Sequence, residues 1–126
     1  MKFAILIYHN PQSREIWDRL TPEQRAEGLR GYAGLDDELA ASGEMIVSQA
    51  LADPSHGTRV SVSSSQVVTS DGPFAEAKEH LAGFYLVDCD GIERAVTLAA
   101  RIPEAAHGLV EVRPTLSLSD FGDLET

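Results

Sequence analysis

The sequence predicts an α+β fold, in which helices cover one face of an antiparallel sheet. Two near-continuous apolar runs, at residues 2–8 and 83–87, have the length of strands that are covered on both faces. Two amphipathic segments, at 21–43 and 90–103, repeat their apolar residues every three or four positions, as helices do. Strand and helix patterns follow each other as β-α-β, hairpin, β-α-β, so the elements alternate instead of separating into two domains.

Length and composition are those of one ordered domain. The chain has 126 residues, 43% of them hydrophobic and 24% charged, which is enough apolar surface for one core and too much for a disordered segment. We expect the domain to span residues 1–118. Residues 119–126 are acidic, and we expect them to form a frayed tail.

The charge of the chain excludes some classes of partner. Twenty acidic and ten basic residues give a net charge of -10, which repels nucleic acids and anionic membranes. The single cysteine, Cys89, has no partner for an internal disulfide, and its neighbours Asp88 and Asp90 disfavour the thiolate, so we interpret it as structural. The run at 2–8 is too short for a signal peptide or a membrane span, and we expect a cytoplasmic protein.

The first long helix has clear start and stop signals. Thr21, Pro22 and Gln24 form a capping box with proline at the first helical position, and Gly43 ends the helix. A short helical turn with Trp17 is expected before it. The residues expected on its buried face are Leu29, Tyr32, Leu35 and Leu39. Three glycines weaken this helix, each by about 1 kcal/mol relative to alanine, so either a close neighbour requires them or the helix is loose. They are Gly28, Gly31 and Gly34.

The remaining elements follow from the same patterns. Strands are predicted at residues 45–51 and 109–113, and a hairpin is predicted from the segments 58–62 and 66–69. Asp90 is the predicted cap of the second helix, which Pro103 ends. The apolar stripe predicted for this helix consists of Ile92, Ala95, Val96 and Ala99, and Arg94 and Arg101 are predicted on its outer face.

This order of elements is that of two split β-α-β units, the ferredoxin-like arrangement, with one hairpin added. Both helices of such a unit lie on one face of the sheet, and the other face stays uncovered. A single domain must bury that apolar face, and a second copy of the chain offers a symmetric way to do so. We therefore expect a homodimer that forms a dimeric α+β barrel.

The densest group of polar residues lies between the hairpin and the strand at 83–87. Within it, Asp71-Gly72-Pro73 has the residues of a turn, and Asp71 is either a turn residue or a functional one. Glu76, Lys78 and His80 place an acid, a cation and an imidazole a few residues apart, either for general acid–base catalysis or as a solvated charged loop. Among them His80 is the best acid–base candidate, because imidazole titrates near neutral pH.

Other candidates lie near strand ends. His9 follows the first strand directly, either as part of a pocket wall or as a residue that merely ends the strand. Glu111 and Arg113 face the same side of the last strand, where Arg113 either binds a substrate carboxylate or forms an exposed cross-strand ion pair. None of the four histidines has a second ligand at zinc-binding spacing, and no nucleotide-binding motif is present, so we expect no metal and no cofactor.

Several motifs resemble those of one family. Asp71-Gly72-Pro73-Phe74, followed by residues 75–79 and by Gly83-Phe84-Tyr85, is similar to the signature of the DGPF group of YCII-related proteins. Supporting matches occur at residues 2–8, at Arg101-Ile102-Pro103 and at residues 111–114. The resemblance thus extends over nearly the whole chain.

The resemblance implies a ferredoxin-like domain that forms a dimeric α+β barrel. For the DGPF group, which is largely uncharacterised, it implies either small-molecule enzymology or an accessory role beside alternative sigma factors. Related proteins include a lyase-type dehalogenase that acts on a lactone, for which a histidine in the first helix and an aspartate after the second are proposed as the active pair. Gly28 and Ile102 stand at those places here, so that pair does not carry over.

Two hypotheses about function remain. The first is a lyase or isomerase that moves a proton on a small, carboxylated molecule, with Asp71 or His80 as the catalytic group and Arg113 orienting the substrate. His9, Lys78 and Glu76 are the further candidates for substrate binding. The second is a non-catalytic ligand-binding or regulatory protein whose acidic surface binds a basic partner such as a sigma factor.

Overall fold

The computed structural model describes residues 1–74 and 76–121. Within these ranges the main sheet is antiparallel and has four strands in the order β2-β5-β1-β6. The strands are β1 (Lys2–His9), β2 (Met45–Ala50), β5 (His80–Asp88) and β6 (Val110–Pro114). The two predicted apolar runs form the central strands β1 and β5, and the predicted ferredoxin-like α+β fold is confirmed.

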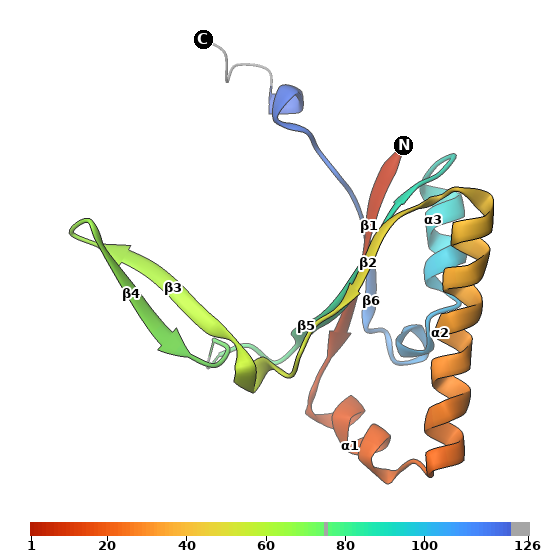
Figure 1. The fold of residues 1–126 in the computed structure, drawn as a ribbon, viewed down its shortest axis with the longest axis horizontal. Coiled ribbons are helices and arrows are strands. Elements are labelled where there is room, and N and C mark those ends of the chain that lie inside the picture. Colours follow the sequence, from red (N-terminus) through yellow and green to blue (C-terminus); the bar gives the residue numbers. More distant parts are fainter. Residues whose placement is uncertain (75, 122–126) are drawn as a thin grey trace.

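The helices lie on one side of this sheet (Figure 1). The α-helices are α1 (Pro11–Arg19), α2 (Pro22–Ser42) and α3 (Ile92–Ala99), and the short 3-10 turns are η1 (Pro54–His56), η2 (Pro103–His107) and η3 (Leu118–Phe121). The element α1 is a full helix of nine residues, where the sequence predicted only a turn. Its N-cap explains the difference, because Asn10 and Ser13 form a capping box that starts the helix.

The core lies between the helices and one face of the sheet. Every second residue of β1, from Phe3 through Ile5 to Ile7, is buried there, and so are Tyr85 and Val87 of β5. The helices and the segment after α3 contribute Leu35, Leu39, Leu98 and Ile102, each 1% exposed or less. Cys89 is also buried, in agreement with a structural role.

The start and the end of α2 are as predicted. The Thr21 hydroxyl accepts a hydrogen bond from the backbone N–H of Gln24, whose side chain accepts one from the backbone N–H of Thr21, and Gly43 ends the helix with a φ of 79°. The prediction for Leu29 was wrong, because this side chain is 59% exposed. The first half of α2 extends past the sheet and runs beside α1 (Figure 1), so it has no sheet to pack on.

The glycines of α2 are not explained by close packing. Within the described residues, a Cβ atom placed on Gly31 or Gly34 would have no neighbour within 4 Å. At Gly28 it would only touch the Trp17 ring at 3.9 Å, an ordinary van der Waals distance. Steric need for glycine is therefore absent at these positions.

The predictions for α3 need two corrections. Its N-cap is Gly91, and no side chain caps it, whereas Asp90 was predicted. Ile92 and Val96 are about half exposed, and the buried face consists of Ala95, Leu98 and Ala99. The helix turns its small residues toward the sheet, which allows a close approach, while Arg94 bonds to Glu44 and Arg101 forms an ion pair with Glu38.

The added hairpin stands apart from the main sheet. It consists of β3 (Thr58–Ser63) and β4 (Gln66–Asp71), which pair only with each other, and all residues of both strands are exposed. Figure 1 shows the hairpin projecting away from the sheet on the side opposite the helices. The strands are longer than predicted, so the loop between β4 and β5 is confined to residues 72–79.

Among residues 1–74 and 76–121, no helix lies on the other face of the main sheet (Figure 1), as the predicted topology requires. The predicted second copy of the chain on this face stays a prediction. Of the predicted acidic tail, residues 119–121 belong to η3, and residues 122–126 lie outside the described part. In the described ranges, no helix combines the length and the apolar character that a bilayer crossing requires.

Candidate functional site

Two of the predicted histidines meet at one end of the sheet. His9 is the last residue of β1 and His80 the first of β5, and the two are directly opposite each other in the antiparallel ladder. Side chains of directly opposed residues point to the same face of a sheet, with Cβ atoms about 5 Å apart. They are separated by 71 positions in the sequence, so only the strand pairing brings them together.

The carboxylate of Glu104 lies beside His9. The Nε2 atom of His9 is 3.8 Å from the Oε2 atom of Glu104, which η2 supplies. The Tyr32 hydroxyl of α2 donates a hydrogen bond to the same carboxylate, at 2.5 Å from Oε2. The Glu104 side chain is only 14% exposed, whereas His9 remains 47% exposed. An imidazole that is backed by a buried carboxylate and open to solvent on its other side can exchange protons with a ligand.

The electrostatics of this group favour an ionised carboxylate. Burial raises the pKa of Glu104, but His9 and the Tyr32 hydroxyl outweigh burial and hold this pKa below its ordinary value. Burial and the hydrogen bond to Glu104 raise the pKa of Tyr32 far above its ordinary value. At neutral pH the pair is therefore a neutral phenol that donates to a charged carboxylate, and the negative charge faces His9.

A hollow of about 490 Å³ lies at the root of the hairpin, and we call it the hairpin-root hollow. Its lining is formed by residues 51–54, 56–59, 72–74, 77 and 79–81. Most of this surface is apolar, with contributions from Leu51, Phe74 and Leu81, and His80 is one of the polar side chains on it. Apolar walls with a few polar groups are typical of small-molecule sites.

The hairpin-root hollow also contains a cation. The guanidinium carbon of Arg59 lies 4.0 Å from the centroid of the Phe74 ring, a cation–π contact. Both side chains line the hollow. Since Arg59 comes from β3 and Phe74 from the loop after β4, this contact also connects the hairpin to the loop at its base.

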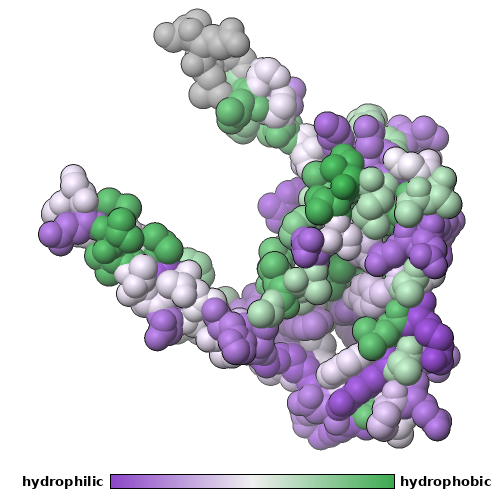
Figure 2. Space-filling view, viewed as in Figure 1, coloured by the Kyte–Doolittle hydropathy of each residue, from purple (hydrophilic) through white to green (hydrophobic). Residues whose placement is uncertain are grey.

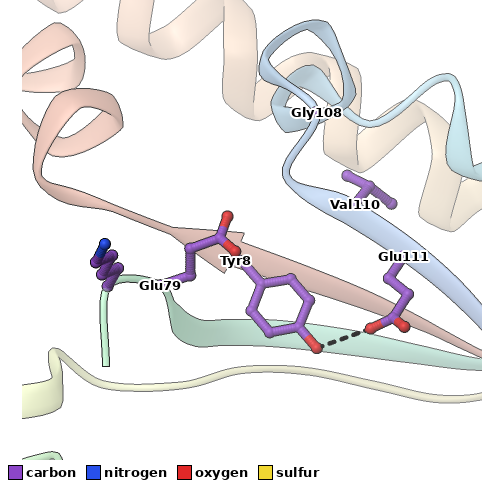
Figure 3. Close-up of a pocket in the computed structure, with 6 residues that line it drawn as sticks. Tyr8, Glu79, Gly108, Val110 and Glu111 are labelled. Atoms are coloured by element: carbon purple, nitrogen blue, oxygen red, sulfur yellow. Dashed lines mark hydrogen bonds between the residues drawn. The ribbon is translucent and has the colours of Figure 1, made fainter. Parts of the chain in front are cut away.

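A second hollow of about 470 Å³ lies where the uncovered sheet face ends, and we call it the open-face hollow. It is lined by Tyr8, Lys78, Glu79, Gly108, Val110 and Glu111, and Figure 3 shows Tyr8 pointing toward Glu111. The Tyr8 hydroxyl donates to Glu111 at 3.0 Å, and Arg113 donates to the same carboxylate at 2.8 Å. These donors hold the pKa of Glu111 below its ordinary value, while burial and Glu111 raise the pKa of Tyr8.

The structure separates the predicted site residues into groups. His9 and His80 share one end of the sheet, whereas Lys78 lines the open-face hollow. Arg113 is 62% exposed and paired with Glu111. The ion pair is exposed, as the alternative from the sequence had it, but it lies within β6 and not across two strands. Asp71 ends β4, and Glu76 lies in the following loop; both are exposed. Ala75, within the same predicted loop, lies outside the described residues.

Three residues of this region were not predicted as functional: Tyr32, Glu104 and Arg59. Tyr32 has the spacing of a core residue, and this spacing does not indicate that its hydroxyl group has a polar contact. Glu104 follows Pro103, a position that the sequence marks only as the end of a helix. Arg59 alternates with apolar residues on an exposed strand, and nothing in that pattern distinguishes it from a solvated charge. In the part of the chain that the structure describes, no group of three or more His, Cys, Asp or Glu side chains is placed to hold a metal ion.

Two comparisons with known proteins give matches over nearly the whole chain. Residues 1–119 match the YCII-related domain. The chain is also similar to an uncharacterized protein of Rhizobium meliloti (strain 1021), with 29% identity over 126 residues, covering 98% of each chain. Since the match to the domain takes in far more than half of the sequence, the chain belongs to the family of YCII-related domains.

Proposed function

We propose that this protein is a small-molecule enzyme of the lyase or isomerase kind, and that it moves a proton at the hairpin-root hollow. The observation that supports this proposal is the direct pairing of His9 with His80, with the Glu104 carboxylate 3.8 Å from His9. His80 also lines the hollow, so one residue of the pair borders the space that a ligand would fill. Proton transfer by a positioned imidazole is the commonest form of general acid–base catalysis.

The two histidines would have different roles. His80 would be the catalytic residue that removes a proton from the substrate carbon. His9 would act as a positioning residue, because the Glu104 carboxylate lies 3.8 Å from its Nε2 atom and Tyr32 holds that carboxylate with a hydrogen bond. In an isomerase His80 returns the proton to another carbon of the same molecule. In a lyase the electrons of the broken C–H bond form a double bond, a neighbouring group leaves with the electron pair of its own bond to carbon, and His80 passes the proton to that group or to water.

The substrate would be a small, partly apolar carboxylate. Arg59 lies in the same hollow as His80 and would bind the carboxylate, while Phe74 and the surrounding apolar wall would contact the rest of the molecule. This assigns to Arg59 the role that the sequence analysis gave to Arg113. Asp71 directly precedes Gly72, which lines the hollow, and its proposed role in proton transfer stays a prediction.

Deuterium exchange would test this proposal without a known product. Small carboxylates, lactones and sugar acids are first screened for thermal stabilisation of the protein, since a ligand at 100 times its dissociation constant stabilises the fold by about 2.7 kcal/mol. The compounds that bind are then incubated with the protein in D2O and followed by proton NMR. We expect loss of one C–H signal, and we expect His80→Gln to slow this loss about 100-fold or more.

Variants of two further histidines accompany the test of His80. His107 is exposed at the end of η2 and belongs to neither hollow, so His107→Gln should exchange at the wild-type rate. His9→Gln should reduce the exchange rate and shift the pH profile of that rate, because His9 is proposed to act through His80 and not on the substrate. Exchange by His80→Gln at the wild-type rate would refute the proposed role of His80.

A non-catalytic role is the alternative, and the net charge of -10 favours it. An acidic surface attracts basic partners, and an alternative sigma factor is the partner that the resemblance implies. In this case ligands would bind without any exchange in D2O, and the protein isolated from its host cells would carry a sigma factor.

We further propose that the chain belongs to the DGPF group, because it contains Asp71-Gly72-Pro73-Phe74. We also propose that it resides in the cytoplasm, because it has only one cysteine.

A further inference from the structure

The open-face hollow is the cavity that the proposed proton transfer does not use. Its volume of about 470 Å³ is that of a small-molecule site. Its lining residues come from three parts of the chain: the end of β1, the loop before β5, and the segment that leads from η2 into β6. The backbone N–H of Tyr8 donates to the carbonyl of Leu109 at 2.9 Å and holds two of these parts together. The hollow is therefore built by the folded sheet and not by a single loop.

The wall of this hollow is mostly polar. The polar side chains that line it are Tyr8, Lys78, Glu79 and Glu111. Lys78 and Glu79 belong to the loop that joins the hairpin to β5. Figure 2 shows mainly hydrophilic surface where the hairpin meets the body, in contrast to the hydrophobic surface on the hairpin itself. A ligand that displaces water from polar groups must offer them new polar partners, so the hollow favours a charged ligand.

Glu111 is a carboxylate that its neighbours hold in place. Arg113 donates to it twice, from Nη2 at 2.8 Å and from Nε at 3.3 Å, and the Tyr8 hydroxyl donates to it at 3.0 Å. Arg113 and Tyr8 also hold the pKa of Glu111 below its ordinary value, so this carboxylate is charged at neutral pH. A carboxylate has about four acceptor sites, and these donors leave room for a further one. The Glu111 side chain is 45% exposed, so a ligand can reach it.

Lys78 and Glu79 bring one further charge of each sign to the hollow. Within the part of the chain that the structure describes, neither of them forms an ion pair, with each other or with another residue. In Figure 3, Tyr8 lies between Glu79 and Glu111. Burial, the hydrogen bond to Glu111 and the charge of Glu79 raise the pKa of the Tyr8 hydroxyl, so this group stays a neutral donor. Because Arg113 is engaged by Glu111, Lys78 is the cation that the hollow offers to a ligand.

A ligand with a single charge meets repulsion in this hollow. A plain amine is attracted by Glu79 and Glu111 but repelled by Lys78, whereas a plain carboxylate is attracted by Lys78 but repelled by the two acids. The net charge of -10 on the chain also repels small anions. A molecule with one ammonium group and one carboxylate group has no net charge, and each of its groups can lie beside the opposite charge.

We propose that the open-face hollow is a second binding site, and that it takes a small zwitterion of the amino-acid kind. The ammonium group of the ligand donates to the Glu111 carboxylate and lies near Glu79, while the carboxylate of the ligand accepts from Lys78. Hydrogen bonds between charged partners are shorter and about twice as strong as neutral ones. Tyr8 contributes by orienting Glu111. This site has its own ligand and does not depend on the proton transfer proposed for His80.

An NMR titration of the wild-type protein tests this site. The probes are the L-α-amino acids and the ω-amino acids up to 6-aminohexanoate, and each probe that binds is compared with the amine and the carboxylate of the same carbon chain. We expect at least one amino acid to shift the signals of Tyr8, Lys78 and Glu111, with a dissociation constant about tenfold or more below those of both analogues. Binding of an analogue as tightly as the amino acid, shifts confined to the hairpin-root hollow, or no binding by any probe would overturn the proposal.

Two lysines allow a matched comparison. Lys78→Gln removes the cation of the hollow, and Lys2→Gln removes an exposed cation from the far end of β1. We expect Lys78→Gln to raise the dissociation constant of the amino acid about tenfold but not that of the plain amine, while Lys2→Gln leaves both within a factor of about two. Equal weakening of the amine and the amino acid in Lys78→Gln would show that Lys78 only shapes the hollow, and would contradict the assigned ion pair.

Glu111→Gln tests the opposite end of the ligand. It should weaken binding of the amino acid about tenfold but not that of the plain carboxylate, because the variant loses a charge that repels the carboxylate. Glu27→Gln, on the exposed side of α2, is the control and should bind the amino acid as wild type does. Lys78 and Glu111 lie outside the core, so the fold should persist in their variants, which circular dichroism checks. An unchanged dissociation constant of the amino acid in Glu111→Gln would refute the role of this carboxylate.

Discussion

Gly83 lies at the centre of β5, where the neighbouring strand leaves no room for a side chain. A Cβ atom on Gly83 would lie 2.9 Å from the carbonyl oxygen of Gln49 and 3.4 Å from the Cα atom of Ala50, both in β2. Both neighbours are backbone atoms, so β2 itself would have to shift. We expect Gly83→Ala to lower the free energy of unfolding by about 1–3 kcal/mol, measured by urea denaturation.

Gly31 provides the contrast for this prediction. It is exposed in the middle of α2, and a Cβ atom there would have open space within 4 Å among the described residues. Alanine is a better helix former than glycine by about 0.5–1 kcal/mol. Gly31→Ala should therefore stabilise the protein by about that amount, and a loss of stability at Gly31 equal to that at Gly83 would contradict the steric argument.

At the scale of elements, the start of α2 depends on one reciprocal cap. The Thr21 hydroxyl satisfies the backbone N–H of Gln24 at 3.1 Å, and the Gln24 side chain satisfies the backbone N–H of Thr21 at 2.9 Å. Since this half of α2 extends beyond the sheet, packing compensates little for a lost cap. We expect Thr21→Ala to cost about 0.5–2 kcal/mol, measured by thermal or urea unfolding.

The control for this cap is a threonine inside a helix. The hydroxyl of Thr97, which is exposed in α3, donates to the backbone carbonyl of Glu93 at 3.0 Å. The Glu93 carbonyl lies inside the helix, so removing the hydroxyl that donates to it costs little stability. Alanine also has a higher helix propensity than threonine. Thr97→Ala should be neutral or slightly stabilising. A cost as large as that of Thr21→Ala would show that the hydroxyl itself, and not its capping position, is what matters.

At the scale of the whole molecule, Glu104 couples three elements to the pH of the solution. Contacts with His9 of β1 and Tyr32 of α2 hold its pKa in the folded protein below the ordinary value of 4.5. As the pH falls through 4.5, the unfolded chain binds the proton first, so the free energy of unfolding decreases until Glu104 is protonated in the folded state as well. We expect this acid-induced loss to be smaller in Glu104→Gln, measured by urea unfolding at pH 3 to 7.

An exposed glutamate gives the comparison for the pH prediction. Glu27 lies on the exposed side of α2, and Glu27→Gln removes the same charge from the surface. This variant should retain the acid-induced loss of stability seen in wild type. If Glu104→Gln and Glu27→Gln lose stability in parallel with wild type as the pH falls, then Glu104 does not contribute to the acid sensitivity of the fold.

The sequence by itself determined the order of the elements and most of their ends, because these depend on neighbouring residues. The capping box of Thr21 and Gln24, the stop at Gly43 and the apolar runs of β1 and β5 are local signals, and each was read correctly. The exposed faces of the helices were predicted less accurately. Leu29 has the spacing of a core residue but extends past the sheet, a fact that no local pattern contains.

The tertiary structure alone decided which polar residues meet. His9 and His80 were both candidates from the sequence, but their pairing depends on the register of β1 against β5, which packing over the whole sheet determines. Glu104 and Tyr32 join them through contacts across 95 and 72 positions of the chain. Local patterns determine an element through neighbours in sequence, whereas a site arises from neighbours in space, which the chain acquires only when the core has formed.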